Sequence, residues 1–275
     1  HPDTLTTRTN LAASYQQAGR TEEAIELLEQ VLTASERVLG PNHRDTLTTR
    51  TNLAASYQQA GRTEEAIELL EQVLTARDRI LGPDHPNTLT TRGNLAFSHW
   101  QAGRTEEAIE LLEQVLTARD RILGPNHPDT LTARGNLAAS YQQAGRTEEA
   151  IELLEQVLTA RERVLGPDHP DTLTARGNLA FSHWQAGRTE EAIELEEQVL
   201  TARDRVLGPN HPDTLTTRGN LAASYQQAGR TEEAIELLEQ VLTASERVLG
   251  PDHPRTIVTR RALERWRTEP GGEEA

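Results

Sequence analysis

The sequence predicts an all-α protein: an α-solenoid in which antiparallel helical hairpins stack into a right-handed superhelix. Three observations predict this class. The chain of 275 residues repeats one text every 42 residues, and a fixed period of about 20–50 residues is typical of repeat architectures. Apolar residues recur at helical spacing, and no segment alternates as a strand would. Hydrophobic residues make up only 35% of the chain, which suits an elongated stack with a thin core.

A histidine opens every copy, at His1, His43, His85, His127, His169, His211 and His253. Six copies are complete, and they cover residues 1–42, 43–84, 85–126, 127–168, 169–210 and 211–252. We expect the partial seventh copy to form a C-terminal capping helix over 253–267, followed by a disordered polar tail over 268–275. Because the chain begins with histidine rather than methionine, we also expect it to be part of a longer protein.

The first helix of each copy is predicted from Pro2 to Ala18 in the numbering of copy 1. Leu11 and Tyr15 lie on one face at helical spacing. Proline suits the first position of a helix because its missing N–H has no partner there. Gly19 then ends the helix in a left-handed conformation.

The second helix follows after a short turn, with Thr21 expected as its N-cap. Its apolar side carries Leu28 and Val38, while its glutamates are expected to face outward. Gly40 and Pro41 end it, since proline cannot continue a helix. One such hairpin leaves apolar surface uncovered, so neighbouring copies must stack on each other.

The two ends of the stack differ. Ile257 and Leu263 take packing positions in the partial seventh copy, and arginines cover the rest of that helix. The first copy is as apolar as the internal ones, which indicates an uncapped N-terminal end. We expect another domain of a longer protein to cover this end, or copies of the chain to stack end to end through it.

The run N-L-A-A-S-Y-x-x-A-G-R-x-E-E-A-I-x-L-L-E-x-V-L, residues 10–32, resembles the tetratricopeptide repeat pattern. The matching signature positions are Leu11, Ala12, Tyr15, Gly19, Ala24, Leu28 and Val31. The 42-residue form is similar to the repeats of kinesin light chains and to C-terminal arrays of bacterial signalling NTPases, and the likeness extends to about residue 267. The resemblance implies a scaffold that binds a protein or peptide in a concave groove. It also implies a possible role as the sensor of a larger signalling protein.

Copies 3 and 5 differ from the others in one short block. They read A-F-S-H-W-Q where the other copies read A-A-S-Y-Q-Q. In the resemblance, the groove is lined by first-helix positions equivalent to Thr6, Thr9, Ala13, Gln16 and Gln17. The aromatic residues Phe97, Trp100, Phe181 and Trp184 are therefore predicted to anchor a peptide. The alternative is a repacking in which phenylalanine fills volume lost when tyrosine becomes histidine.

Polar residues complete the predicted site. Asn94, Asn136 and Asn178 match the second asparagine of the kinesin light chain N-N-L-A motif, which binds the backbone of the ligand. A bond from these asparagines to a neighbouring helix is the competing interpretation. Gln101 and Gln185 follow the tryptophans and are included among the candidate peptide-binding residues.

Glu196 occupies a position that is leucine in the other five complete copies. A buried carboxylate without a partner is costly or stays protonated. The exchange is interpreted as neutral drift with a partly exposed side chain, or as the mark of a less stable packing contact in copy 5.

Several function classes are excluded or disfavoured. A chain without cysteine has no disulfide, thiolate nucleophile or cysteine metal site. The formal charge of −15 disfavours nucleic acid and anionic membranes. Loop histidines of adjacent copies are expected about 8–10 Å apart, too far to share one zinc ion. We find no catalytic motif, and expect a cytoplasmic protein without cofactor, metal or catalytic residues.

The leading hypothesis is therefore a non-enzymatic protein-interaction scaffold. A structural module that self-associates end to end is the first alternative. A designed or consensus array without a natural ligand is the second, because the copies are nearly identical.

Overall fold

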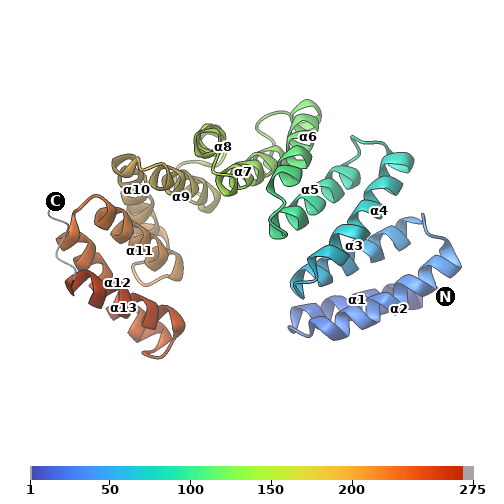
Figure 1. Cartoon of the computed structure of the whole chain (residues 1–275), viewed down its shortest axis with the longest axis horizontal. Helices are drawn as coiled ribbons and strands as arrows, with labels where there is room; N and C mark the ends of the chain where they lie inside the picture. The colour runs from blue at the N-terminus through green and yellow to red at the C-terminus, as the bar shows by residue number, and fades with distance from the viewer. Residues whose placement is uncertain (1, 269–275) are drawn as a thin grey trace. The chain divides into compact units, whose positions relative to one another are not determined.

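The structure is a computed structural model that describes residues 2–268, and it divides into two compact units, 1–144 and 145–275. The described residues of the first unit form seven helices, which Figure 1 labels. They are α1 (Pro2–Gln17), α2 (Thr21–Leu39), α3 (Arg44–Gln59), α4 (Thr63–Leu81), α5 (Pro86–Gln101), α6 (Thr105–Leu123) and α7 (Pro128–Gln143).

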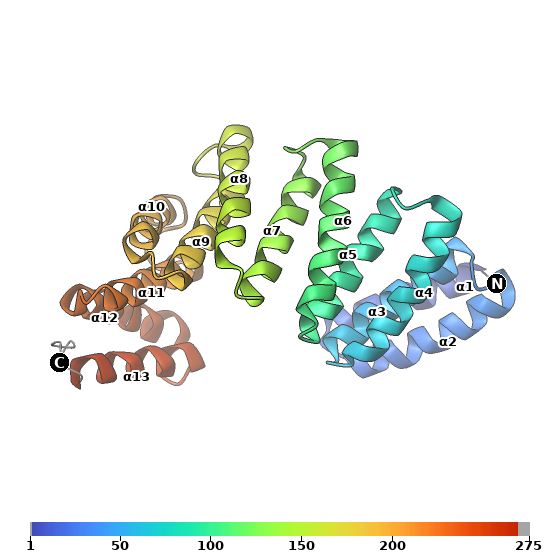
Figure 2. The same ribbon diagram turned by 45° about the horizontal axis from the view of Figure 1, so that its top comes forward.

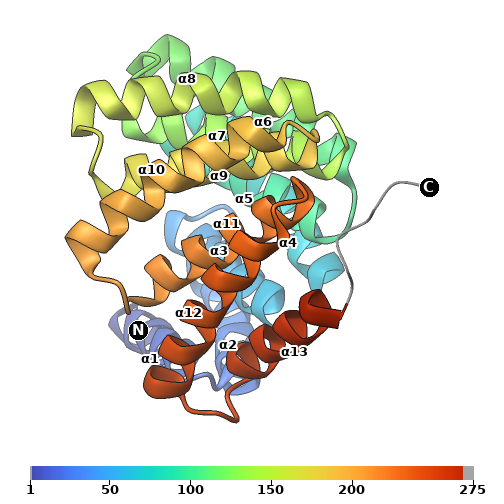
Figure 3. The ribbon, with the colours of Figure 1, turned by 90° about the vertical axis from the view of Figure 1, so that its left-hand side faces the viewer.

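The second unit repeats the same elements, and Figure 3 turns it toward the viewer. Its helices are α8 (Thr147–Leu165), α9 (Pro170–Gln185), α10 (Thr189–Leu207), α11 (Pro212–Gln227), α12 (Thr231–Leu249) and α13 (Pro254–Thr268). The part of the chain that the structure describes contains no strand. The predicted all-α solenoid is confirmed.

Within each unit, every helix packs against the helix that precedes it and the one that follows it (Figure 1 and Figure 2). Helices of 16 and 19 residues alternate through the complete repeats. Their apolar faces meet in a narrow core, in which Ala54, Leu70 and Val73 are at most 1% exposed. Leu11 is 46% exposed, whereas Leu53, its equivalent in α3, is 2% exposed. This difference follows from position, because α3 packs between α2 and α4, whereas no described helix precedes α1.

The repeated histidine caps the first helix of each repeat. In His85 and His127 the ring Nδ1 accepts a hydrogen bond from the backbone N–H two residues later, at 3.1 and 3.2 Å. The same bond occurs at His43, His169, His211 and His253. A capping side chain satisfies one of the backbone donors that a helix start leaves without a partner. The histidines of the loops thus have a local structural role.

Three sequence expectations need correction in detail. Thr21 is the first residue of α2 rather than its N-cap, and the capping position is Arg20, whose side chain makes no capping bond. Val38 does not lie on the buried side of the helix, because its side chain is 55% exposed. Thr268 is helical, and the remainder of the predicted tail, 269–275, lies outside the described residues.

Ion pairs join each second helix to the first helix of the next repeat. Arg134 is 7% exposed and reaches the carboxylate of Asp120 at 3.1 Å. Equivalent pairs join Arg50 to Glu36, Arg92 to Asp78, Arg176 to Glu162, Arg218 to Asp204 and Arg260 to Glu246. The guanidinium of each pair except the last is nearly buried.

Candidate functional site

The aromatic residues of repeats 3 and 5 form two stacked pairs. Phe97 and Trp100 lie one turn apart on α5, with ring centroids 5.8 Å apart and planes 15° from parallel. Phe181 and Trp184 on α9 repeat this arrangement at 5.8 Å and 17°. Phe97 is 48% exposed and Phe181 45% exposed. Each pair therefore presents an aromatic surface to solvent.

The first pair forms one wall of an open cavity of about 180 Å³ within the first unit. Its lining comes from three helices: Gly93, Ala96, Phe97 and Trp100 from α5, Leu112 from α6, and Asn136, Ala139 and Ser140 from α7. A dry cavity of roughly 150 Å³ holds a benzene ring. The pocket of repeat 3 is thus large enough for one side chain of an incoming ligand.

The tryptophans replace glutamines that join successive repeats elsewhere. Gln58 Nε2 donates to Ser98 Oγ at 2.6 Å, and Gln16 makes the same bond to Ser56 at 2.5 Å. Trp100 and Trp184 make no such bond, and their buried Nε1 atoms have no partner among the described residues. A buried donor without a partner destabilises the fold, so packing alone does not explain the tryptophans.

The accompanying histidines also lose interactions. Tyr57 donates its hydroxyl to Glu29 at 2.7 Å and packs under the guanidinium of Arg62. His99 and His183 occupy the tyrosine position, are buried, and leave Nδ1 without a partner in the described chain. Burial lowers the pKa of both imidazoles, and the nearby Arg104 and Arg188 lower them further. Both rings are therefore neutral near neutral pH.

The repacking alternative requires phenylalanine to fill buried volume beside these histidines. The rings of Phe97 and Phe181 instead stack on the tryptophans, and almost half of each is exposed.

The predicted polar residues differ in whether they line the pocket of repeat 3. Asn136 lines the pocket, and its side chain makes no hydrogen bond to other described residues. Asn94 lies one residue beyond the pocket wall, and its backbone carbonyl accepts a bond from Ser98. Asn178, Gln101 and Gln185 are exposed on α9, α5 and α9, and Gln101 is not part of the pocket lining.

Glu196 on α10 is buried, with 6% of the residue exposed, so its side chain does not escape to the edge. Oε2 has no hydrogen-bond partner in the described part of the chain. Burial raises the pKa of this carboxyl to about 7, and the nearby Ser224 hydroxyl lowers it in part. The departure from the repeat marks this position in the sequence, but the burial of the side chain is evident only from the fold.

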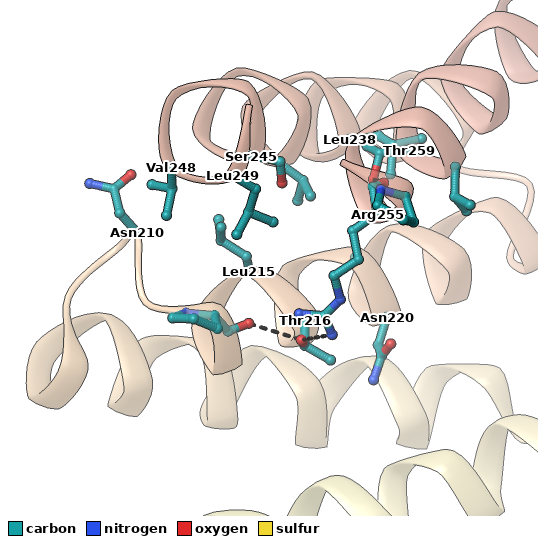
Figure 4. Close-up of a pocket in the computed structure, with 15 residues that line it drawn as sticks. Asn210, Leu215, Thr216, Asn220, Leu238, Ser245, Val248, Leu249, Arg255 and Thr259 are labelled. Carbon is teal, nitrogen blue, oxygen red and sulfur yellow. Dashed lines mark hydrogen bonds between the residues drawn. The ribbon is translucent and has the colours of Figure 1, made fainter. Parts of the chain in front are cut away.

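A second cavity, of about 360 Å³, lies in the second unit among α11, α12 and α13 (Figure 4). Its walls are largely apolar, with Leu215, Leu238 and Val248 among the lining residues. Arg255 crosses from α13 and donates to Thr216 at 3.1 Å. The core positions of the last complete repeat meet α13 here, and this cavity has no aromatic pair in its lining.

The other tested site types receive no support from the described residues. None of the helices that the structure describes is long and apolar enough to cross a membrane. Within residues 2–268 there is also no cluster of three or more histidine, aspartate or glutamate side chains that suits a metal ion.

Two tetratricopeptide repeat family models match this sequence. One matches residues 3–79, 45–121, 93–163 and 129–205, and the other matches 214–255. The chain belongs to the tetratricopeptide repeat family. Tetratricopeptide repeats are generally non-enzymatic scaffolds suited to protein–protein interaction. No curated protein matches the chain.

Solved tetratricopeptide structures resemble the chain. A structure of nearly identical TPR-like repeats from a putative kinesin light chain of Podosopora anserina is 38% identical, with a TM-score of 0.69. The match covers 74% of this chain and 97% of that one.

Two more distant structures share the fold. BtubC from P. vanneervenii is 18% identical with a TM-score of 0.63, and the match covers 94% and 96% of the two chains. A signal transduction ATPase with a tetratricopeptide repeat sensor, from Pyrococcus horikoshii, is 15% identical with a TM-score of 0.73. That match covers 96% of this chain and 39% of the ATPase.

Proposed function

We propose that this chain is a non-enzymatic scaffold that binds a peptide segment of a partner protein, with its aromatic pairs as the anchoring sites. One observation carries the proposal: Phe97 and Trp100 stack beside an open pocket at positions where other repeats have alanine and glutamine. Burying an exposed aromatic surface supplies much of the binding energy at protein interfaces.

The cost of the aromatic block to the fold supports the same proposal. Each block removes a glutamine–serine bond and a tyrosine–glutamate bond that other repeats make. The exposed carboxylates of the second helices lie outside the pocket lining. The pocket therefore selects an apolar or aromatic side chain, while uncharged groups such as Asn136 contact the peptide backbone.

The proposal is tested by selecting a displayed peptide library on the chain and on the Trp100→Ala/Trp184→Ala variant. We expect peptides that bind the parent and lose at least about tenfold in affinity on the variant. The matched control is Gln16→Ala/Gln58→Ala, which removes inter-repeat hydrogen bonds at the same helical position without removing aromatic surface. No enrichment, or equal binding to the parent and the tryptophan variant, contradicts the proposal.

Self-association is a second candidate function, and the exposure of Leu11 favours it. Leu11 is 46% exposed at a position that is at most 4% exposed in the repeats that follow. A second copy of this chain would cover that surface. Sedimentation over a concentration series tests this candidate: the parent should gain mass with concentration and Leu11→Glu should remain a monomer. A parent mass that does not change with concentration removes the candidate.

A sensor role within a larger signalling protein remains a prediction. The signal transduction ATPase named above carries a tetratricopeptide repeat sensor, and the likeness between the chains is one of fold.

A further inference from the structure

The residues that line the pocket of repeat 3 recur, with one exception, 84 residues later in the sequence. Each pocket residue has an equivalent in the second unit, and the equivalents are Gly177, Ala180, Phe181, Trp184, Glu196, Asn220, Ala223 and Ser224. Seven of these eight positions carry the same residue in both places. The exception is Glu196, which replaces Leu112. The two sites therefore differ by one exchange, from an apolar side chain to a carboxyl.

The structure of the second unit agrees with this correspondence. Phe181 and Trp184 stack as the first pair does. The Glu196 carboxyl interacts with the hydroxyl of Ser224, which is the equivalent of the pocket residue Ser140. Glu196 thus faces the residue that, by equivalence, forms the opposite wall.

Glu196 has no cationic partner within residues 2–268. Among the residues that the structure describes, no ion pair involves Glu196, and its Oε2 has no hydrogen-bond partner. The Ser224 hydroxyl lies beside the carboxyl and carries no charge. Leu112, in contrast, completes an apolar wall in its own pocket. The carboxyl is therefore buried without a counter-charge, at a position that is leucine in the other five complete copies.

We propose that the aromatic site of repeat 5 binds a cationic side chain, arginine or lysine, of a peptide ligand, with Glu196 as its counter-charge and Phe181 and Trp184 as its aromatic wall. A guanidinium or ammonium group is attracted to the face of an aromatic ring. It also forms charge-assisted hydrogen bonds with a carboxylate, which are stronger than neutral ones. The equivalent site of repeat 3, with Leu112 in place of the carboxyl, takes an apolar side chain. This inference rests on the proposed function, because it assigns the ligand chemistry of one of its two anchoring sites.

The test uses N-acetylarginine amide as the probe and N-acetylcitrulline amide as its uncharged counterpart. NMR signals of the indole N–H groups of Trp100 and Trp184, assigned with single Trp→Phe variants, report each site separately. The titration is run at pH 8, where Glu196 is ionised in the folded chain. We expect the arginine compound to shift the Trp184 signal with an affinity at least about tenfold above that of the citrulline compound.

Two exchanges give matched controls. Glu196→Gln keeps the shape of the side chain and should abolish the preference for arginine over citrulline. Leu112→Glu places a carboxyl in the first site and should make the Trp100 signal respond to the arginine compound. Circular dichroism of both variants checks that each remains helical.

Three results overturn the inference: equal responses of the two tryptophans in the parent, equal affinity for arginine and citrulline, or an arginine preference that survives Glu196→Gln. Equal affinity would make Glu196 an acceptor for neutral donors. A failed peptide selection contradicts the proposed function alone, because these probes report the chemistry of one site without a peptide ligand. The converse result is a set of selected peptides that bind through the tryptophans but have no basic residue whose contribution to affinity is lost in Glu196→Gln. That result contradicts this inference and leaves the proposed function standing.

Discussion

At the scale of single residues, the carboxyl of Glu196 makes the stability of the chain depend on pH. Its pKa is about 7 in the folded chain, against an ordinary value of 4.5. Between these values the folded state holds a proton that the unfolded state has released, so stability falls as pH rises from about 4.5 to about 7. Above about pH 7 the loss is complete.

Glu196→Leu removes this dependence. The variant should gain stability over the parent as pH rises through that window, by about 3 kcal/mol in total. Urea unfolding at a series of pH values between 4.5 and 8 measures the difference. Glu194→Leu, an exposed glutamate on the same helix, is the control and should show no growing difference. Parallel curves for the parent and Glu196→Leu would mean that the carboxyl is hydrated.

The aromatic block is expected to lower stability, and its reversal gives a second prediction. The triple variant Phe97→Ala/His99→Tyr/Trp100→Gln restores the text of the other repeats and with it the tyrosine and glutamine hydrogen bonds. Its free energy of unfolding should exceed that of the parent by about 1–3 kcal/mol, so its melting temperature should be higher. It should also lose peptide binding. A lower melting temperature would show that the aromatic pair is part of the core.

At the scale of the helix, the loop histidine sets where the first helix of each repeat begins. His127 accepts the backbone N–H of Asp129, so His127→Ala should cost about 1 kcal/mol. His127→Asp retains an acceptor at the cap and should keep most of the stability. Thermal unfolding of both variants measures the effect. Equal losses in both would mean that the cap contributes nothing and that the loop packing matters instead.

The helices and their order follow from the repeated sequence, because the apolar periodicity and the helix-ending Gly-Pro pair both act within one hairpin. The buried pair of Arg134 with Asp120 was not predicted, because it depends on where the backbone places a side chain relative to the preceding helix. A signal for the pair was present, since arginine and an acidic residue recur at the same two positions in every complete copy.

The candidate site was predictable in part, for the same reason. A departure from the repeat identifies Phe97, Trp100 and Glu196 without any structure. The sequence does not reveal that Leu112 and Asn136 border the same pocket, because these come from two other helices. The burial of Glu196 depends on α9 and α11, which pack on its helix.

At the scale of the molecule, helices whose main contacts within each unit are with their sequence neighbours predict nearly additive stability. Deleting residues 85–126 removes one whole period and joins two equivalent positions. The shortened chain should keep the same helix content per residue. The slope of its unfolding free energy against urea concentration should fall in proportion to the loss of surface that unfolding exposes. Circular dichroism with urea unfolding measures both. Loss of helix throughout the chain would contradict independent repeats.

The pocket lining is drawn from two consecutive repeats, at positions that recur in every copy. Near-identical coding blocks of one period invite unequal recombination, which inserts, removes or reorders whole copies. A copy with the sequence Phe-Ser-His-Trp supplies half of a pocket. A following copy that reads A-A-S-Y-Q-Q supplies the asparagine, alanine and serine of the other half, so the pocket forms wherever the two copies are adjacent in this order. New ligand preferences can therefore arise in such a gene by recombination of existing copies. A single later substitution, such as Leu to Glu, then gives two duplicated sites different ligand preferences.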